Sequence, residues 1–224
     1  MFARLSRSGK STFVVEILMI VVGINIALWF EGLFEDIKDA ETEQQYLEGL
    51  RNDLKYDVNN LDILIRDNDA KIESLNALLP SISEFSDLSV ERQAAAIYEP
   101  SSYLFFNPSD FTYQSMQESG DFRLLRDDTI KKDLLKLARY YRLIDELQAN
   151  FIQAMDSEYI PLMMSKFDLA TNRISDPSLT DDQIFRNFFV YTIQDTSGRL
   201  ATYKKARELA NQLLLQIELK PGDG

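Results

Sequence analysis

One stretch near the start of the chain limits the possible folds more than any other. Residues 11–30 read STFVVEILMIVVGINIALWF. Residues 13–30 are 18 residues, which as a helix measure about 27 Å, close to the thickness of about 30 Å of a bilayer core. The insertion free energy of the aliphatic side chains outweighs the cost of one carboxylate near the end of the stretch. We therefore predict a transmembrane helix over residues 13–30, with the lipid bilayer as its partner.

A cleaved signal peptide is the alternative reading of this stretch. Its apolar run is longer than the roughly 7–15 residues usual for such peptides, and no A-x-A cleavage site follows it. Bulky Leu28, Trp29 and Phe30 stand where small residues would be needed. We therefore expect an anchor that stays on the protein.

The charges on the two sides of the span predict its orientation. Three bases and no acid precede it: Arg4, Arg7 and Lys10. Four acids follow it closely: Glu31, Glu35, Asp36 and Asp39. By the positive-inside rule residues 1–12 form a cytoplasmic tail, and the body lies outside the membrane. In a bacterium with an outer membrane this is the periplasmic side of the inner membrane.

Composition removes several classes of function. The chain has no cysteine and no histidine, so the usual ligands of zinc, iron–sulfur and haem sites are missing, and we expect no metal and no cofactor. The net charge of −12 argues against nucleic acid as a partner. The segment SGKST at 8–12 lacks the first glycine of a P-loop, because Arg4 stands there. Pairs among 36 acids arise by chance, so no catalytic residues are assigned and no enzyme is expected.

Polar and small residues inside the apolar stretch raise a separate question. On a helix Glu16, Gly23 and Ala27 share one stripe, and Asn25 lies on the opposite face. Two opposed faces suit a helix with a neighbour on each side, so these four residues are candidates for helix association within the membrane. Two other readings stay open, namely simple tolerance of polar groups and a path for protons or ions.

The rest of the chain predicts an all-α fold. Apolar residues recur at helical spacing along three long stretches, and no alternating pattern of a sheet is visible. We expect a membrane-proximal long helix or stalk over 31–79, an antiparallel helical bundle over 80–219 that packs with 40–79, and a tail at 220–224. Ser89 is an expected helix cap, Asp127 or Asp128 another, Thr180 and Gln183 form an expected capping box, and Gly198 is an expected break in the last helix.

Five aromatic residues cluster in the connection between the long stretches: Tyr103, Phe105, Phe106, Phe111 and Tyr113. They are candidates for an exposed patch that binds a partner. The alternative, which we favour, is that they fill the interior of the bundle, because large apolar residues are usually buried.

Three segments carry a resemblance to a known family. They read EILMIVVGINIAL at 16–28, YLEGLRNDL at 46–54 and FTYQSMQESGDFRLLRDDTIKKDLLKLARYY at 111–141. The chain resembles an uncharacterised family of bacterial single-span membrane proteins, a domain of unknown function, over much of its first 140 residues. It departs from the family pattern at Asn25, where an aliphatic residue is usual, and after Ala27. The resemblance implies a bacterial inner-membrane protein and brings no activity or site residues.

These observations together give the functional expectation. We expect a membrane-anchored, outward-facing helical interaction module that forms a homo-oligomer or binds another envelope protein. The alternative is a ligand-sensing input domain that signals through a partner protein.

Overall fold

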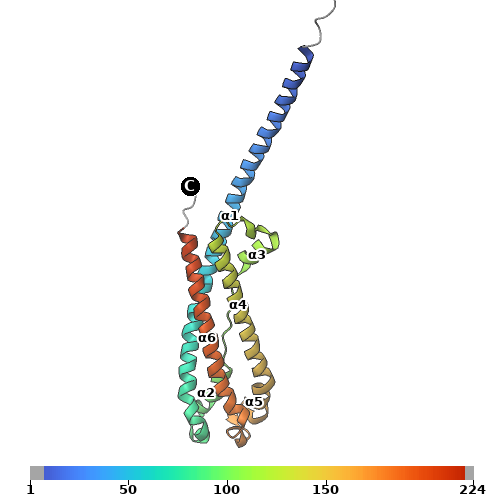
Figure 1. Ribbon diagram of the computed structural model, residues 1–224. Helices are drawn as coiled ribbons and strands as arrows, with labels where there is room; N and C mark the ends of the chain where they lie inside the picture. Colours follow the sequence, from blue (N-terminus) through green and yellow to red (C-terminus); the bar gives the residue numbers. More distant parts are fainter. Residues whose placement is uncertain (1–7, 220–224) are drawn as a thin grey trace, which may run out of the picture.

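A single uninterrupted helix runs through the first third of the chain. The computed structural model describes residues 8–219, so Arg4, Arg7 and the tail at 220–224 lie outside the described residues. Helix α1 spans Ser8–Leu78, 71 residues or about 105 Å. It contains both the predicted span and the predicted stalk without a break. Figure 1 shows its first half projecting beyond the bundle and its second half packed within it.

The projecting half of α1 is apolar, and within residues 8–219 its apolar window packs against no other part of the chain. An 18-residue window in this helix has a mean hydropathy of 2.1, and no residue of the window is buried against the rest of the chain. Large apolar side chains such as Phe13 and Trp29 are each 63% exposed. Among the described residues α1 is the one helix long and apolar enough to cross a membrane.

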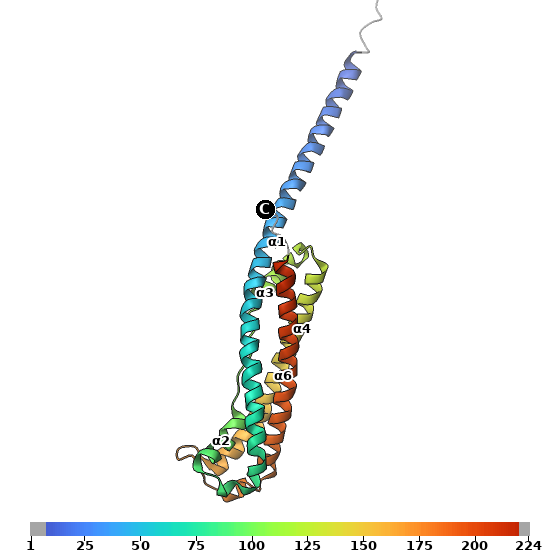
Figure 2. The same cartoon turned by 90° about the vertical axis from the view of Figure 1, so that its left-hand side faces the viewer.

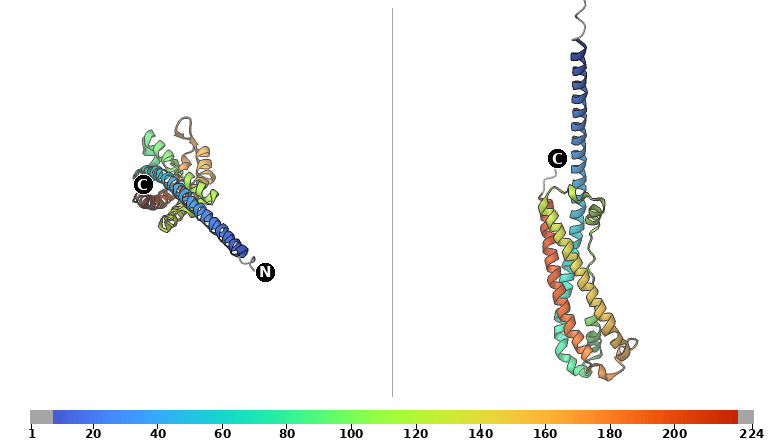
Figure 3. Two further views of the ribbon diagram at one scale, coloured as in Figure 1. Left: turned by 90° about the horizontal axis from the view of Figure 1, so that it is seen from above. Right: turned by 45° about the vertical axis from the view of Figure 1, so that its right-hand side comes forward.

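Three long helices form the bundle: the second half of α1, α4 (Asp128–Ala154) and α6 (Gln183–Glu218). They lie side by side in Figures 2 and 3, and α6 packs against both of the others. Helix α6 runs back toward the projecting half of α1, antiparallel to α1 and α4. The predicted all-α fold is therefore confirmed.

The connection from α1 to α4 returns along the bundle mostly as extended chain. It begins with a 3₁₀ segment, η1 (Leu79–Asp87), and helix α2 (Val90–Ser101) at the far end. Residues 102–110 then run back along α1 and α4 to α3 (Phe111–Ser119) and the 3₁₀ turn η2 (Asp121–Leu124). Because this return crosses the length of the bundle before α4 begins, α1 and α4 run in the same direction.

The far end of the bundle is closed by short elements. Helix α4 continues into a π-helical turn, η3 (Met155–Tyr159), and then α5 (Ile160–Lys166). A two-residue antiparallel ladder pairs β1 (Phe167–Asp168) with β2 (Arg173–Ile174), and the 3₁₀ turn η4 (Pro177–Leu179) leads to α6. No sheet was expected, and this ladder is too short to leave an alternating pattern in the sequence.

The predicted helix ends are partly right. The side chain of Ser89 accepts a hydrogen bond from the Arg92 amide, and Asp127 caps α4 through the amides of Thr129 and Ile130. The capping box at Thr180 and Gln183 is wrong, because the Asp182 carboxylate caps α6 instead, at 2.9 Å from the Ile184 amide.

The break expected at Gly198 is also wrong, since α6 passes through it. A helix-interior glycine costs only about 1 kcal/mol. Leu200 and Tyr203, which follow in the same helix, are buried in the bundle and hold it in place.

Two apolar clusters make up the core. The cluster nearer the projecting half of α1 joins α1, α4 and α6 through residues such as Leu54, Leu137 and Tyr203. The cluster at the far end gathers η1, α2, α5 and the start of α6 around Phe151 and Phe185. The predicted apolar faces of the three long helices supply most of the first cluster, whereas the short elements at the far end supply most of the second.

Candidate functional site

The four candidate residues of the apolar stretch all face outward. Glu16, Gly23, Asn25 and Ala27 are exposed, and a side chain added at Gly23 would meet nothing within 4 Å. The Asn25 amide donates to the carbonyl oxygen of Val21, one turn earlier, at 2.7 Å. Its donor therefore has a partner within the helix. The face with Glu16, Gly23 and Ala27 and the opposite face with Asn25 are both uncovered by the rest of the described chain.

The five aromatic candidates do not form one surface. Phe106 is 3% exposed and belongs to the core, so including it in an exposed patch was wrong. Tyr103 stacks on Phe151, with ring centroids 5.2 Å apart, and Tyr113 packs edge-on against Phe122.

Only Phe105 and Phe111 among the five stand out from the surface, at 51% and 79% exposed. A side chain of the extended segment alternates between the interior and the solvent. This alternation is why Phe105 and Phe106 differ.

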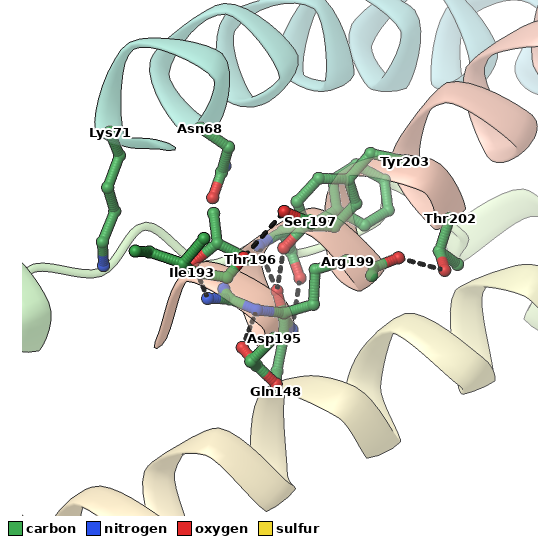
Figure 4. A network of polar contacts seen from close by, with 12 residues as sticks. Asn68, Lys71, Gln148, Ile193, Asp195, Thr196, Ser197, Arg199, Thr202 and Tyr203 are labelled. Carbon is green, nitrogen blue, oxygen red and sulfur yellow. Dashed lines mark hydrogen bonds and ion pairs between the residues drawn. The ribbon is translucent and has the colours of Figure 1, made fainter. Parts of the chain in front are cut away.

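A layer of buried polar side chains crosses the bundle between the two apolar clusters. Helix α1 contributes Asn68 and Lys71, α4 contributes Gln148, and α6 contributes Thr196 and Arg199. Figure 4 shows these side chains converging from the three helices. Gln148 also fixes the extended segment: its carbonyl oxygen accepts from the Phe106 amide at 2.7 Å, and its amide donates to the Phe106 carbonyl at 3.2 Å.

Arg199 is the centre of this layer. It is 1% exposed, and its Nε donates to the Asp195 carboxylate at 2.7 Å. Its guanidinium lies over the rings of Tyr103 and Phe151, at 4.7 and 4.8 Å from their centroids. Stacking between two aromatic faces and one carboxylate stabilises a charge that would otherwise be costly to bury.

Lys71 is the second buried cation of the layer. Its ammonium donates to the carbonyl oxygens of Ser102 and Pro100. Burial, helped by the positive charge of Arg199, lowers the pKa of Lys71 to about 8. Lys71 therefore ties α1 to the start of the returning segment, and its charge is the most easily lost in the layer.

A cavity of about 370 Å³ lies in the half of the bundle nearer the projecting helix. Its walls come from α1, the end of the returning segment, the start of α3 and α4. Apolar side chains form most of it: Leu50, Leu54, Phe106, Pro108, Leu134, Leu137 and Ala138. This volume and lining are typical of a small-molecule site.

Two carboxylates of α1 lie along one wall of this cavity, one helical turn apart. Asp53 accepts from the Ser109 hydroxyl at 2.9 Å and from the Thr112 amide at 3.1 Å, so it caps α3 from a distance. Asp57 accepts from the Ser109 amide and from the Tyr141 hydroxyl, both at 2.7 Å. Burial raises the pKa of Asp57 to about 6, and the charges of Asp53 and Asp110 add to the effect.

The remaining charges of the cavity lie toward solvent. Asp110, just before α3, and Asp145 of α4 both line it, and among the described residues no hydrogen bond or ion pair is found for either side chain. Arg142 supplies the cavity's one guanidinium. The described residues contain no group of three or more side chains placed to hold a metal ion.

Sequence reasoning missed both the polar layer and the cavity. The layer had a signal: the apolar spacing of α1 skips a turn between Ile65 and Ile72, where Asn68 and Lys71 take the inward positions. The cavity had none, because its carboxylates come from parts of the chain that are far apart in sequence.

Comparisons with known proteins give one result about family. No match was found among curated proteins or among solved structures. One family model matches residues 16–192, which extends well past the resemblance expected from the sequence. The match begins at Glu16 and takes in the cavity and most of the polar layer. Since it covers more than half of the chain, the protein belongs to DUF6090, a family of unknown function.

Proposed function

We propose that this protein is a single-span membrane protein whose helical bundle works by binding on the outer side of the inner membrane. The observation that carries the proposal is the apolar window of α1, which is not buried against the rest of the described chain and is continuous with a core helix of the bundle. Exposed apolar surface of this extent is unfavourable in water and favourable in lipid. A rigid connection of this kind holds the bundle at a fixed distance and orientation from the bilayer.

The charge pattern supports the orientation. The bases of the tail lie before the apolar stretch, whereas Glu31, Glu35 and Asp36 follow it directly. Basic residues favour the cytoplasmic side. The bundle is then in the periplasm of a bacterium with two membranes.

A charge-insertion experiment tests the anchor. Changing Val21, Val22 and Ile24 to arginine costs about 8–10 kcal/mol of insertion free energy, more than the remaining aliphatic side chains supply. The triple variant is expected in the soluble fraction after cell lysis, and a Glu91→Arg control on exposed α2 is expected to stay in the membrane. A triple variant that stays in the membrane fraction after an alkaline wash would contradict the proposal.

Self-association is the second part of the proposal, through the stripe of Glu16, Gly23 and Ala27. Gly23→Leu is expected to abolish cross-linking between copies in the membrane, because close approach of two helices needs a small residue. Gly32→Leu is the matched control, since Gly32 is also open to space but lies beyond the span. Unchanged cross-linking in Gly23→Leu would refute this part.

A second candidate function, ligand sensing through a partner protein, is favoured by the cavity. A site formed jointly by α1 and α4 would connect ligand binding directly to the helix that enters the membrane. Binding of any small molecule in this cavity would stiffen the contact between those helices.

A further inference from the structure

We propose that the cavity between α1, the 106–110 segment and α4 binds a small organic amine with an apolar body. The inference deepens the ligand-sensing function proposed above and rests on it. It is carried by the volume of the cavity, by its apolar and aromatic interior, and by rim carboxylates that have no hydrogen-bond or ion-pair partner in the described part of the chain.

The interior of the cavity suits an apolar group. Leu54, Leu134 and Leu137 supply aliphatic walls. Phe106 and Tyr141, whose ring centroids are 5.2 Å apart, supply aromatic ones. A volume of about 370 Å³ takes a ligand with one ring or a short alkyl chain. Burying that body is the main source of affinity.

The charge of the lining selects the polar end of the ligand. Four carboxylates (Asp53, Asp57, Asp110 and Asp145) face one guanidinium, for a formal charge of −4 + 1 = −3. Anions such as carboxylates and phosphates are repelled, whereas a cation is attracted. Faces of aromatic rings add to the attraction for an ammonium.

The rim carboxylates are the groups that an ammonium would reach. Asp53 and Asp57 are already engaged by Ser109. Asp110 stands at the position before α3 but makes no capping hydrogen bond, and Asp145 is exposed on α4. These two carboxylates are therefore available to a ligand whose apolar part lies deeper.

A metal ion fits this site less well than an amine. A hard cation such as Ca²⁺ takes six to eight oxygen ligands. Within the described chain no three acids come together closely enough to start such a shell, and most of the wall is hydrocarbon. An ammonium needs only a few acceptors and tolerates apolar neighbours.

Calorimetry on the full chain in lipid nanodiscs tests the inference, with empty nanodiscs as blank. The probes are phenethylamine, its neutral analogue 2-phenylethanol and the anion 3-phenylpropionate. Phenethylamine is expected to bind at least about fivefold more tightly than the alcohol, which corresponds to about 1 kcal/mol for one exposed charge pair. The anion is expected not to bind.

Three variants locate the binding. Ala138→Trp fills the cavity and is expected to abolish binding of phenethylamine, and Asp145→Asn is expected to weaken it about fivefold. Glu146→Gln, the neighbouring acid outside the cavity, is the matched control and is expected to bind as the wild type does. Asp145→Asn changes an exposed side chain, so it tests the site even if the tryptophan disturbs packing.

The possible outcomes distinguish a failure of the preference for amines from a failure of the ligand site as a whole. Equal binding of amine and alcohol, both lost in Ala138→Trp, would overturn the amine and keep a ligand site. Binding of none of the three probes, or binding unaffected by Ala138→Trp, would overturn the site itself. Neither result bears on membrane attachment, which the fractionation experiment measures separately.

Discussion

Replacing Asp57 with asparagine should change how the stability of the bundle depends on pH. Asp57 is 1% exposed, and burial raises the pKa of its carboxyl from 3.8 to about 6. The folded state therefore holds this proton more tightly than the unfolded state does. The stability that Asp57 gives is fully present below about pH 4 and is lost as the pH rises through about 6. At about 1.4 kcal/mol for each pKa unit, the loss is about 3 kcal/mol.

The asparagine fits the same hydrogen bonds without a charge. Its carbonyl oxygen can accept from the Ser109 amide, and its amide can donate to the Tyr141 hydroxyl, which both accepts and donates. The variant therefore removes the titration and leaves the packing. Asp53 and Asp110 stay in place near it, so the comparison isolates one carboxyl.

The assay is urea unfolding of the full chain in detergent micelles, followed by far-ultraviolet circular dichroism from about pH 4 to about pH 8. The unfolding free energy of the wild type minus that of Asp57→Asn should fall by about 3 kcal/mol over this range. Asp62→Asn, at a half-exposed position of α1, is the control for losing one acid. A difference that stays constant across the range would refute the reasoning.

Four further predictions concern packing and the polar layer. Gly49→Ala should lower the unfolding free energy by about 1 kcal/mol in urea titrations, because the new methyl would lie 2.8 Å from the Thr112 hydroxyl, and Thr112→Ala should reverse the loss. Gly198→Ala should instead raise the unfolding free energy by about 0.5–1 kcal/mol, because the new methyl group would meet nothing within 4 Å. Arg199→Met should cost about 3 kcal/mol by the same measurement, since it leaves the largely buried Asp195 carboxylate without its ion pair. The unfolding free energy of the wild type minus that of Lys71→Met should rise as the pH goes from about 8 to about 10. The reason is that the folded state loses the Lys71 ammonium proton at a lower pH than the unfolded state does. A difference that stays flat or falls would contradict this prediction.

The sequence predicted the helices well because their apolar faces are long. The seam through Leu47, Leu50 and Leu54 on α1 faces the core as expected. Regular spacing over many turns leaves little room for another fold. The same reasoning identified the exposed apolar half of α1.

Local competition explains the errors at helix ends and turns. Thr180 and Asp182 both had the chemistry of a cap, but the Thr180 hydroxyl donates to the Pro177 carbonyl in the preceding turn. Asp182 is then left to begin α6. The ladder between β1 and β2 involves only two residues on each side, and no periodicity can appear in so short a run.

The candidate site could be predicted only in part. The inward positions of Asn68 and Lys71 interrupt the seam of α1, and such an interruption indicates a buried polar layer. The cavity depends on contacts between α1, the 106–110 segment and α4, so its acids meet only after the chain has folded. The spacing of residues along the sequence does not indicate which acids become neighbours in the folded chain.

Labelling of single cysteines from outside the cell tests the central claim most directly. The chain has no cysteine of its own, so Ser6→Cys in the tail and Ser178→Cys in the exposed turn before α6 each give one reporter. A membrane-impermeant maleimide applied to cells with a permeabilised outer membrane should label Ser178→Cys at once, and Ser6→Cys only after the inner membrane is opened. Labelling of Ser6→Cys alone, or of both positions equally in intact inner membranes, would contradict a span that holds the bundle on the outer side.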